Sequence, residues 1–234
     1  MTPQDLEWLL SAAVRRIRVT TSGHVRHDGL RSLDQAIAYR NRHVIDRFVE
    51  RYALPRDEAE DLFVETLRWL WLCARAERDP QAPEVFIDDC MALLDEMWHT
   101  FLLFTREYSD YCAANLGGFV HHAPTTAEDK RRVASEVAAD PDGFTARKEA
   151  RLRALYEYVY DELGEETLVK WYSTYPEKYP PGFLKSLLIG FVPVSTDTQP
   201  TQDQHQTTEA AHDQEGAHRE AHQAEPPGQR SVLA

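Results

Sequence analysis

The stretch of residues 93–108, LLDEMWHTFLLFTREY, places a histidine, His99, in the middle of a strongly apolar segment. Asp95 precedes His99 by one helical turn, so its carboxylate can accept a hydrogen bond from one ring nitrogen. Such a contact fixes the tautomer of the imidazole and leaves the other nitrogen for a metal, a proton or a second residue. Glu96 and His99 also have the Glu-x-x-His spacing that aims two ligands inward in di-iron carboxylate bundles, although residues 1–194 contain no second copy.

Two adjacent histidines, His121 and His122, follow a Gly-Gly pair at residues 117–118 that is expected to end the helix. If the helix kinks near residues 105–109, the chain can fold back and bring one of them close to His99; otherwise another helix must supply the remaining ligands. Two histidines and a carboxylate would form a three-ligand site with a position open to water or substrate. The cofactor that fits such a site is a divalent metal such as Zn or Fe.

The sequence therefore names a set of candidate site residues. The candidate metal ligands are Asp95, His99, His122 and, as an alternative, His121. The candidate proton-transfer groups are Glu96 and Tyr108. Each has a structural interpretation as well, because a buried histidine beside an aspartate is more often a structural pair, and a His-His pair after a helix can cap its carbonyl groups. Four tryptophans are expected in the core: Trp69, Trp71, Trp98 and Trp171.

The segment of residues 95–131, DEMWHTFLLFTREYSDYCAANLGGFVHHAPTTAEDKR, resembles the signature of the glycine-rich domain-containing protein-like family. In that family an Asp precedes Trp-His-Thr-His, and a Tyr, a Gly, a His and an acidic-polar segment follow. The matching positions are Asp95, residues 98–100, Tyr108, Gly117 or Gly118, and His122 or His121. The resemblance covers roughly residues 62–132 and is to a bacterial-type member without the glycine-rich tail. It implies an intracellular helical protein.

One position departs from the family's pattern. Phe101 stands where the family has the second histidine of its Trp-His-Thr-His motif, so the resemblance does not carry over a paired-histidine site. Either the doublet at His121 and His122 compensates for this difference, or the metal site is weakened or lost.

The elements that must position these residues are helical throughout. Apolar residues recur at three- and four-residue steps, with Ser32 and Pro55 as helix starts, a capping box at Thr125 and Glu128, and Gly164 as a stop. The predicted helical stretches are residues 32–54, 55–78, 84–116, 125–140 and 145–164, followed by a short helix that starts at residue 165 and ends near Pro176. Residues 180–194 are expected to close the folded part. The predicted fold is all-α, a single bundle of roughly six or seven helices.

The composition sets the domain organisation and excludes several partners. Residues 1–194 are predicted to form the helical domain, whereas residues 195–234 are polar, Gln- and His-rich and acidic, which predicts a disordered tail. The net charge of -13 disfavours binding to nucleic acid and to anionic membrane surfaces. No apolar run is long enough to span a bilayer, and the three cysteines form no disulfide framework, so a cytoplasmic location is expected.

Two functions follow from these observations. The first is a metal-dependent enzyme that acts on a small molecule or a peptide, with the candidate residues named above. The alternative is a noncatalytic adaptor that binds a partner protein or peptide and uses the tail as a tether or regulator. Signatures of serine hydrolases, P-loop proteins and dinucleotide-binding proteins are missing from the sequence.

Overall fold

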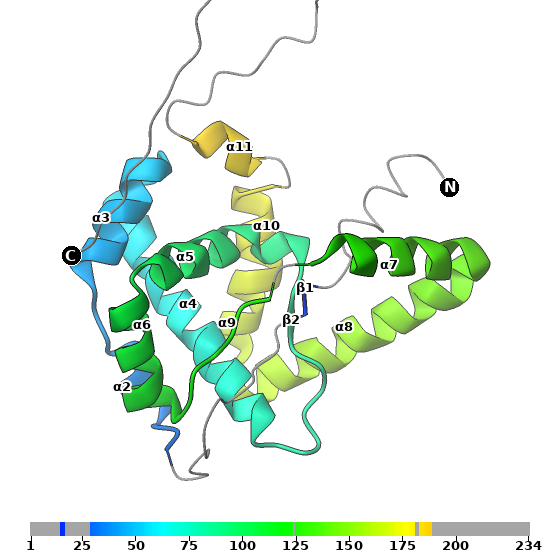
Figure 1. Ribbon diagram of the computed structural model, residues 1–234, viewed down its shortest axis with the longest axis horizontal. Coiled ribbons are helices and arrows are strands. Elements are labelled where there is room, and N and C mark those ends of the chain that lie inside the picture. The colour runs from blue at the N-terminus through cyan, green and yellow to red at the C-terminus, as the bar shows by residue number, and fades with distance from the viewer. Residues whose placement is uncertain (1–14, 17–28, 124, 181–182, 189–234) are drawn as a thin grey trace, which may run out of the picture. The chain divides into compact units, whose positions relative to one another are not determined.

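The computed structural model describes residues 15–16, 29–123, 125–180 and 183–188, and within these ranges the fold is all-α, as predicted (Figure 1). The ten α-helical segments are α2 (Leu33–Ile37), α3 (Arg42–Arg51), α4 (Arg56–Glu77), α5 (Ala92–Leu103), α6 (Thr105–Tyr111), α7 (Ala127–Ala139), α8 (Pro141–Leu163), α9 (Glu165–Val169), α10 (Tyr175–Lys178) and α11 (Phe183–Leu187). Two short strands, β1 (Arg15–Arg16) and β2 (Phe86–Ile87), pair antiparallel. These ranges contain more helical segments than the six or seven predicted, because three of the predicted helical stretches are each divided into two or more segments.

The first divided stretch, residues 32–54, forms α2 and α3. Ser32 caps α2 as predicted. The side chain of Asn41 accepts hydrogen bonds from two amides of the first turn of α3, and Arg40 donates to the carbonyl oxygen of Ile37 at 2.7 Å. The end of α2 and the start of α3 are therefore both satisfied by side chains, although the apolar spacing continues across the break.

The start of α7 lies one residue later than predicted. The capping box uses Thr126 and Asp129, not Thr125 and Glu128: the Thr126 hydroxyl accepts from the Asp129 amide at 3.1 Å, and the Asp129 carboxylate accepts from the Thr126 amide at 3.2 Å. The sequence offers two registers, Thr-Thr followed by Glu-Asp, and the spacing rule alone does not choose between them.

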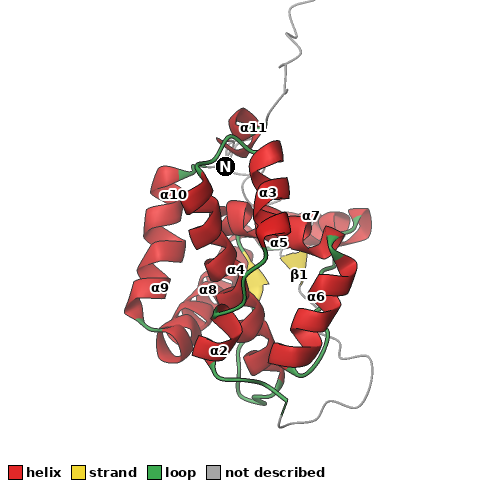
Figure 2. Cartoon of the chain, turned by 90° about the vertical axis from the view of Figure 1, so that its left-hand side faces the viewer, coloured by secondary structure: helices red, strands yellow, loops and turns green. Residues whose placement is uncertain are grey.

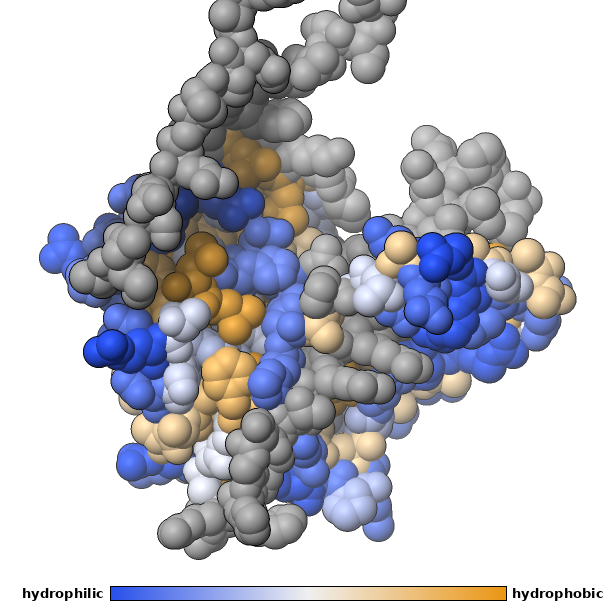
Figure 3. All heavy atoms as spheres, viewed as in Figure 1, coloured by the Kyte–Doolittle hydropathy of each residue, from blue (hydrophilic) through white to orange (hydrophobic). Residues whose placement is uncertain are grey.

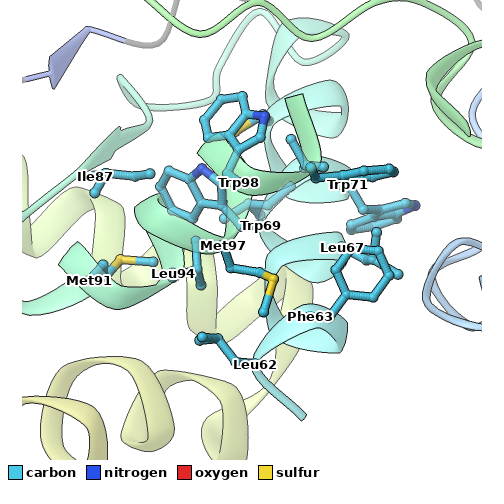
Figure 4. Packing of buried hydrophobic residues seen from close by; sticks show 14 of the residues in the cluster. Leu62, Phe63, Leu67, Trp69, Trp71, Ile87, Met91, Leu94, Met97 and Trp98 are labelled. Carbon is cyan, nitrogen blue, oxygen red and sulfur yellow. The ribbon is translucent and has the colours of Figure 1, made fainter. Parts of the chain in front are cut away.

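The core forms around α4 and α5, which pack against each other in the middle of the described helices (Figures 1 and 2). Leu67 and Trp69 of α4 lie close to Met97 and Trp98 of α5 in the buried cluster (Figure 4). The four tryptophans predicted to be buried are in the core, with exposed fractions of 0% for Trp69, Trp98 and Trp171 and 9% for Trp71. Helix α4 is thus buried along most of its length, because its apolar residues face several neighbours at once.

The predicted helix over residues 84–116 is interrupted in a way that matters for the site. It begins with β2 and a 3₁₀ turn. Helix α5 then ends at Leu103, and the next residue, Phe104, has backbone angles (φ -90°, ψ 63°) that are not helical. Helix α6 follows at once and continues into a π-helical turn, Cys112–Leu116. The break lies directly before the range in which a kink was predicted as one of two alternatives. No glycine or proline marks it in the sequence.

Gly117 ends this segment and turns the chain back toward α5. Its φ of 69° lies in the left-handed region, and an added Cβ would lie 2.7 Å from both Arg78 Nη2 and the backbone of Gly29. Arg78 in turn donates to the carbonyl oxygen of Leu116 at 2.7 Å. The predicted helix stop is confirmed, and it is a stop that only glycine fits.

The C-terminal tail and the question of membrane-spanning helices were also subjects of prediction. The tail at residues 195–234 and its histidines lie outside the described residues, so the predicted disorder and the domain boundary near residue 194 stay predictions. Among the described helices, none combines the length and the apolar character needed to cross a membrane.

Replacing Gly117 with alanine is expected to destabilise the fold by about 1–3 kcal/mol, because the new Cβ adds backbone strain and collides with two neighbours. Urea unfolding followed by circular dichroism measures the change. An unfolding midpoint equal to that of wild type would contradict the described turn.

Candidate metal centre

The structure brings together three of the predicted ligands: Asp95 and His99 from α5, and His122 from the loop that follows α6. One nitrogen of each histidine and one oxygen of Asp95 all lie within 4.8 Å of one another. Nε2 of His122 is 2.7 Å from Asp95 Oδ1, and Nε2 of His99 is 3.9 Å from Asp95 Oδ2. The two imidazole rings are 4.5 Å apart between centroids. We call these three residues the triad.

Burial differs sharply within the triad. The Asp95 side chain is fully buried and that of His122 is 6% exposed, whereas the side chain of His99 is 38% exposed. A carboxylate without access to water needs hydrogen-bond or ionic partners, and both histidines are placed to serve it. The site is therefore closed on the side of Asp95 and open to solvent at His99.

The loop that carries His122 is held by two aromatic side chains. Trp98 of α5 packs edge-on against the His122 ring at 4.4 Å between centroids, and its indole N–H donates to the Tyr108 hydroxyl at 3.1 Å. The Tyr108 hydroxyl donates to the carbonyl oxygen of Val120 at 2.6 Å. These contacts fix the backbone two residues before His122, so the position of its ring depends on α5 and α6 together.

The Trp-His-Thr motif has a separate role at each position. Trp98 supports the loop and His99 contributes an imidazole, while the hydroxyl of Thr100 donates to the carbonyl oxygen of Glu96 at 2.9 Å. Phe101, which replaces the second motif histidine of the similar family, is fully buried and lies 5.2 Å from the ring of Phe63. Position 101 thus belongs to the apolar core, and the triad forms without a histidine there.

Glu96 lies beside the triad and contacts its exposed histidine. Its Oε1 is 3.5 Å from His99 Nδ1, and its Oε2 accepts a 2.6 Å hydrogen bond from the hydroxyl of Tyr52. Burial alone would raise the pKa of Glu96, but the hydrogen bonds of His99 and Tyr52 lower the pKa to about 2. Glu96 is therefore ionised at neutral pH and presents a negative charge to His99.

Two predicted residues have other surroundings. His121 is not part of the triad: its ring packs against Phe119 at 4.6 Å, because adjacent residues of an extended loop point to opposite sides. Tyr108 is fully buried, and burial raises the pKa of its phenol well above the ordinary value. With its proton donated to Val120, Tyr108 supports the loop, and its predicted proton-transfer role stays a prediction.

One residue of the site was missed in the sequence. Tyr52 ends α3 and is separated from Glu96 by 44 residues. Local spacing marks it only as an apolar position of its helix, and nothing in the sequence relates it to the histidine motif. Only the packing of α3 against α5 brings the two side chains together.

The surface near α5, α6 and the following loop mixes apolar and hydrophilic residues (Figure 3). Leu103, one helical turn after His99, is 64% exposed and is the most exposed large apolar side chain of the described residues. The open side of the site thus has an apolar neighbour on α5 itself.

Replacing Tyr108 with phenylalanine is expected to cost about 1–3 kcal/mol of stability, because the carbonyl of Val120 and the indole N–H of Trp98 would be left unpaired in the core. Chemical denaturation measures the loss. Tyr160→Phe is the matched control, since Tyr160 is 51% exposed and little change is expected there. Equal stability of the two variants would contradict the supporting role of Tyr108.

The stability contributed by Glu96 is expected to depend on pH. Its folded pKa of about 2 lies below the ordinary 4.5, so the contribution is complete above about pH 4.5 and is lost as the pH falls toward about 2. The measurement is the difference in unfolding free energy between wild type and Glu96→Gln, in chelator, from about pH 7 to about pH 3. A difference that does not shrink at the acidic end would argue against the lowered pKa.

Comparisons with known proteins point to the same part of the chain. A family model described as UCP032817-like matches residues 41–139, which include the whole triad and also Tyr52 and Glu96. Searches of the curated proteins and of the solved structures found no match. The chain is thus similar to the UCP032817-like family over less than half of its 234 residues, in the region that builds the candidate metal centre.

Proposed function

We propose that this protein binds a divalent transition metal through Asp95, His99 and His122 and uses it in chemistry on a small molecule or a peptide. The observation that carries the proposal is the convergence of two imidazoles and one buried carboxylate within 4.8 Å. These residues come from two segments that are far apart in the sequence, so helical spacing alone does not account for the arrangement.

Each histidine lies near one oxygen of the Asp95 carboxylate, and the two distances can be compared with those at a zinc ion. Zn–ligand bonds of about 2.0–2.1 Å place tetrahedral ligand atoms about 3.3 Å apart. The 3.9 Å between His99 Nε2 and Asp95 Oδ2 is close to that value. The 2.7 Å between His122 Nε2 and Asp95 Oδ1 is a hydrogen-bond distance, so a proton lies between two atoms that would be ligands of a metal. A metal that takes this place must displace the proton, which makes binding dependent on pH.

The donor set favours Zn or Fe. Two imidazoles and one carboxylate are the ligands of mononuclear zinc hydrolases and of non-haem Fe(II) enzymes, both of which keep coordination positions open. The exposed side of His99 gives those positions access to solvent. A metal bound there would lower the pKa of its water toward about 7 and would make hydroxide available at neutral pH.

The resemblance to the glycine-rich domain-containing protein-like family belongs to this proposal. Its motif residues, Trp98 to Thr100, supply one member of the triad, His99, and the indole ring that packs against another, His122. A cytoplasmic location is also proposed, because the three cysteines are few and irregularly spaced in the sequence and form neither a CxxC pair nor a dense disulfide framework.

The proposal is tested with full-length, untagged protein titrated with Zn(II), and with Fe(II) under anaerobic conditions, by calorimetry and metal analysis. Wild type is expected to bind a single equivalent at the triad and to gain thermal stability from it. The double variant His99→Ala/His122→Ala is expected to lose that equivalent.

The four histidines of residues 195–234 need their own control, because spaced histidines can bind metal adventitiously. The control variant has glutamine in place of these four histidines, His205, His212, His218 and His222. It keeps the triad, so it should still bind one equivalent of metal tightly. Metal binding that disappears in this variant and persists in His99→Ala/His122→Ala would reject the metal centre. The noncatalytic protein-binding alternative would then be left.

A further inference from the structure

The triad is connected to a distant part of the chain through Glu96. The hydroxyl of Tyr52 donates to Glu96 Oε2 at 2.6 Å, and the other carboxylate oxygen lies 3.5 Å from His99 Nδ1. The three side chains therefore form a row that ends at the exposed histidine of the triad. Because Nδ1 of His99 faces the carboxylate, Nε2 faces Asp95 and His122.

Tyr52 is held firmly by contacts that do not involve Glu96. It is 2% exposed, its amide donates to the carbonyl oxygen of Phe48 at 2.9 Å, and its ring packs on that of Phe48 at 4.7 Å between centroids. Its backbone forms a β-bridge with Leu188, and the neighbouring amide of Ala53 donates to Leu187 at 2.7 Å. The guanidinium of Arg51 lies over the ring, 5.4 Å from its centroid. The fold thus fixes the hydroxyl before any contact with Glu96.

Glu96, in contrast, has a flexible side chain that is 23% exposed. A rigid donor that holds one oxygen of a flexible carboxylate determines where the other oxygen lies. A carboxylate that accepts from Nδ1–H of a histidine keeps the proton there and leaves the Nε2 lone pair for a metal. Tyr52 therefore determines the position of the Glu96 carboxylate, and the carboxylate in turn determines which nitrogen of His99 carries the proton.

We propose that Tyr52 is a positioning residue of the metal centre: through Glu96 it sets the tautomer and the ring orientation of His99. This inference rests on the proposed function, since it concerns how well the triad holds a metal. Tyr52 itself has no place among the ligands.

A second tyrosine–glutamate pair in the protein supplies a matched control. The hydroxyl of Tyr179 donates to Glu58 Oε2 at 2.5 Å, but the cation beside that carboxylate is Lys178, at 2.8 Å, and not a histidine. Loss of the Tyr179 hydroxyl removes the same kind of bond without touching the triad.

The test measures Zn(II) affinity of the full-length chain in five forms: wild type, Tyr52→Phe, Glu96→Gln, the double variant, and Tyr179→Phe. Outer-shell partners of a metal-bound histidine typically contribute about 10–100-fold in affinity. Tyr52→Phe is expected to weaken binding by about 10-fold and Glu96→Gln by up to about 100-fold. The double variant should bind no more weakly than Glu96→Gln alone, because Tyr52 acts through Glu96. Tyr179→Phe should bind like wild type.

A second measurement needs no metal. In chelator, long-range ¹H–¹⁵N spectra report which nitrogen of His99 carries the proton. Wild type and Tyr179→Phe should show the Nδ1–H form, and Tyr52→Phe should show a larger share of the Nε2–H form. Unfolding curves of the same samples separate this change from a loss of folded protein.

The outcomes distinguish this inference from the proposed function. Wild type that binds Zn(II) at the triad with the same affinity as Tyr52→Phe would overturn the positioning role and leave the metal centre standing. The positioning role would also be overturned if the losses of Zn(II) binding free energy in Tyr52→Phe and Glu96→Gln add up in the double variant. A wild type that binds no metal at the triad would overturn the proposed function, and this inference with it.

Discussion

The buried carboxylate of Asp95 is the constraint on which the rest of the site depends. With no exposure to water, it must be matched by polar groups within the protein, since an unpaired charge in an apolar core is costly. One histidine comes from its own helix, and the other comes from a loop 27 residues farther along the chain. The loop therefore has to return to α5, and several features between α5 and His122 serve that return.

The chain returns to α5 through two interruptions of the helix, and different side chains stabilise the backbone after each of them. Helix α5 stops before Phe104, the π-helical turn stops before Gly117, and Arg78, at the C-terminal end of α4, donates to the last carbonyl of that turn. Past the turn, Tyr108 holds Val120 in place. Each support is a hydrogen bond or a close packing contact made by a buried or partly buried group, so the loop has little freedom to move away from α5.

The site also brings together segments that lie far apart in the sequence. Tyr52 directly follows α3, and α5 carries Glu96 and the first two members of the triad. Leu188, directly after α11, forms a β-bridge with Tyr52. A polar cluster held by several packed elements keeps its geometry better than one held by a single helix. This arrangement is what a metal centre requires, and it explains why one end of the cluster, at His99, can remain exposed to solvent.

Local patterns in the sequence are enough to predict the helical class, the bounds of α4, the burial of the four tryptophans, and a set of histidines that includes both histidines of the triad. These follow from local rules: apolar spacing, helix-start residues and glycine stops act over a few residues. The break at Phe104, the position of His122 rather than His121 beside Asp95, and the contact of Tyr52 with Glu96 depend on how distant segments pack. The break has no local signal, adjacent loop residues differ only in the side to which they point, and a contact across 44 residues depends on how two helices pack.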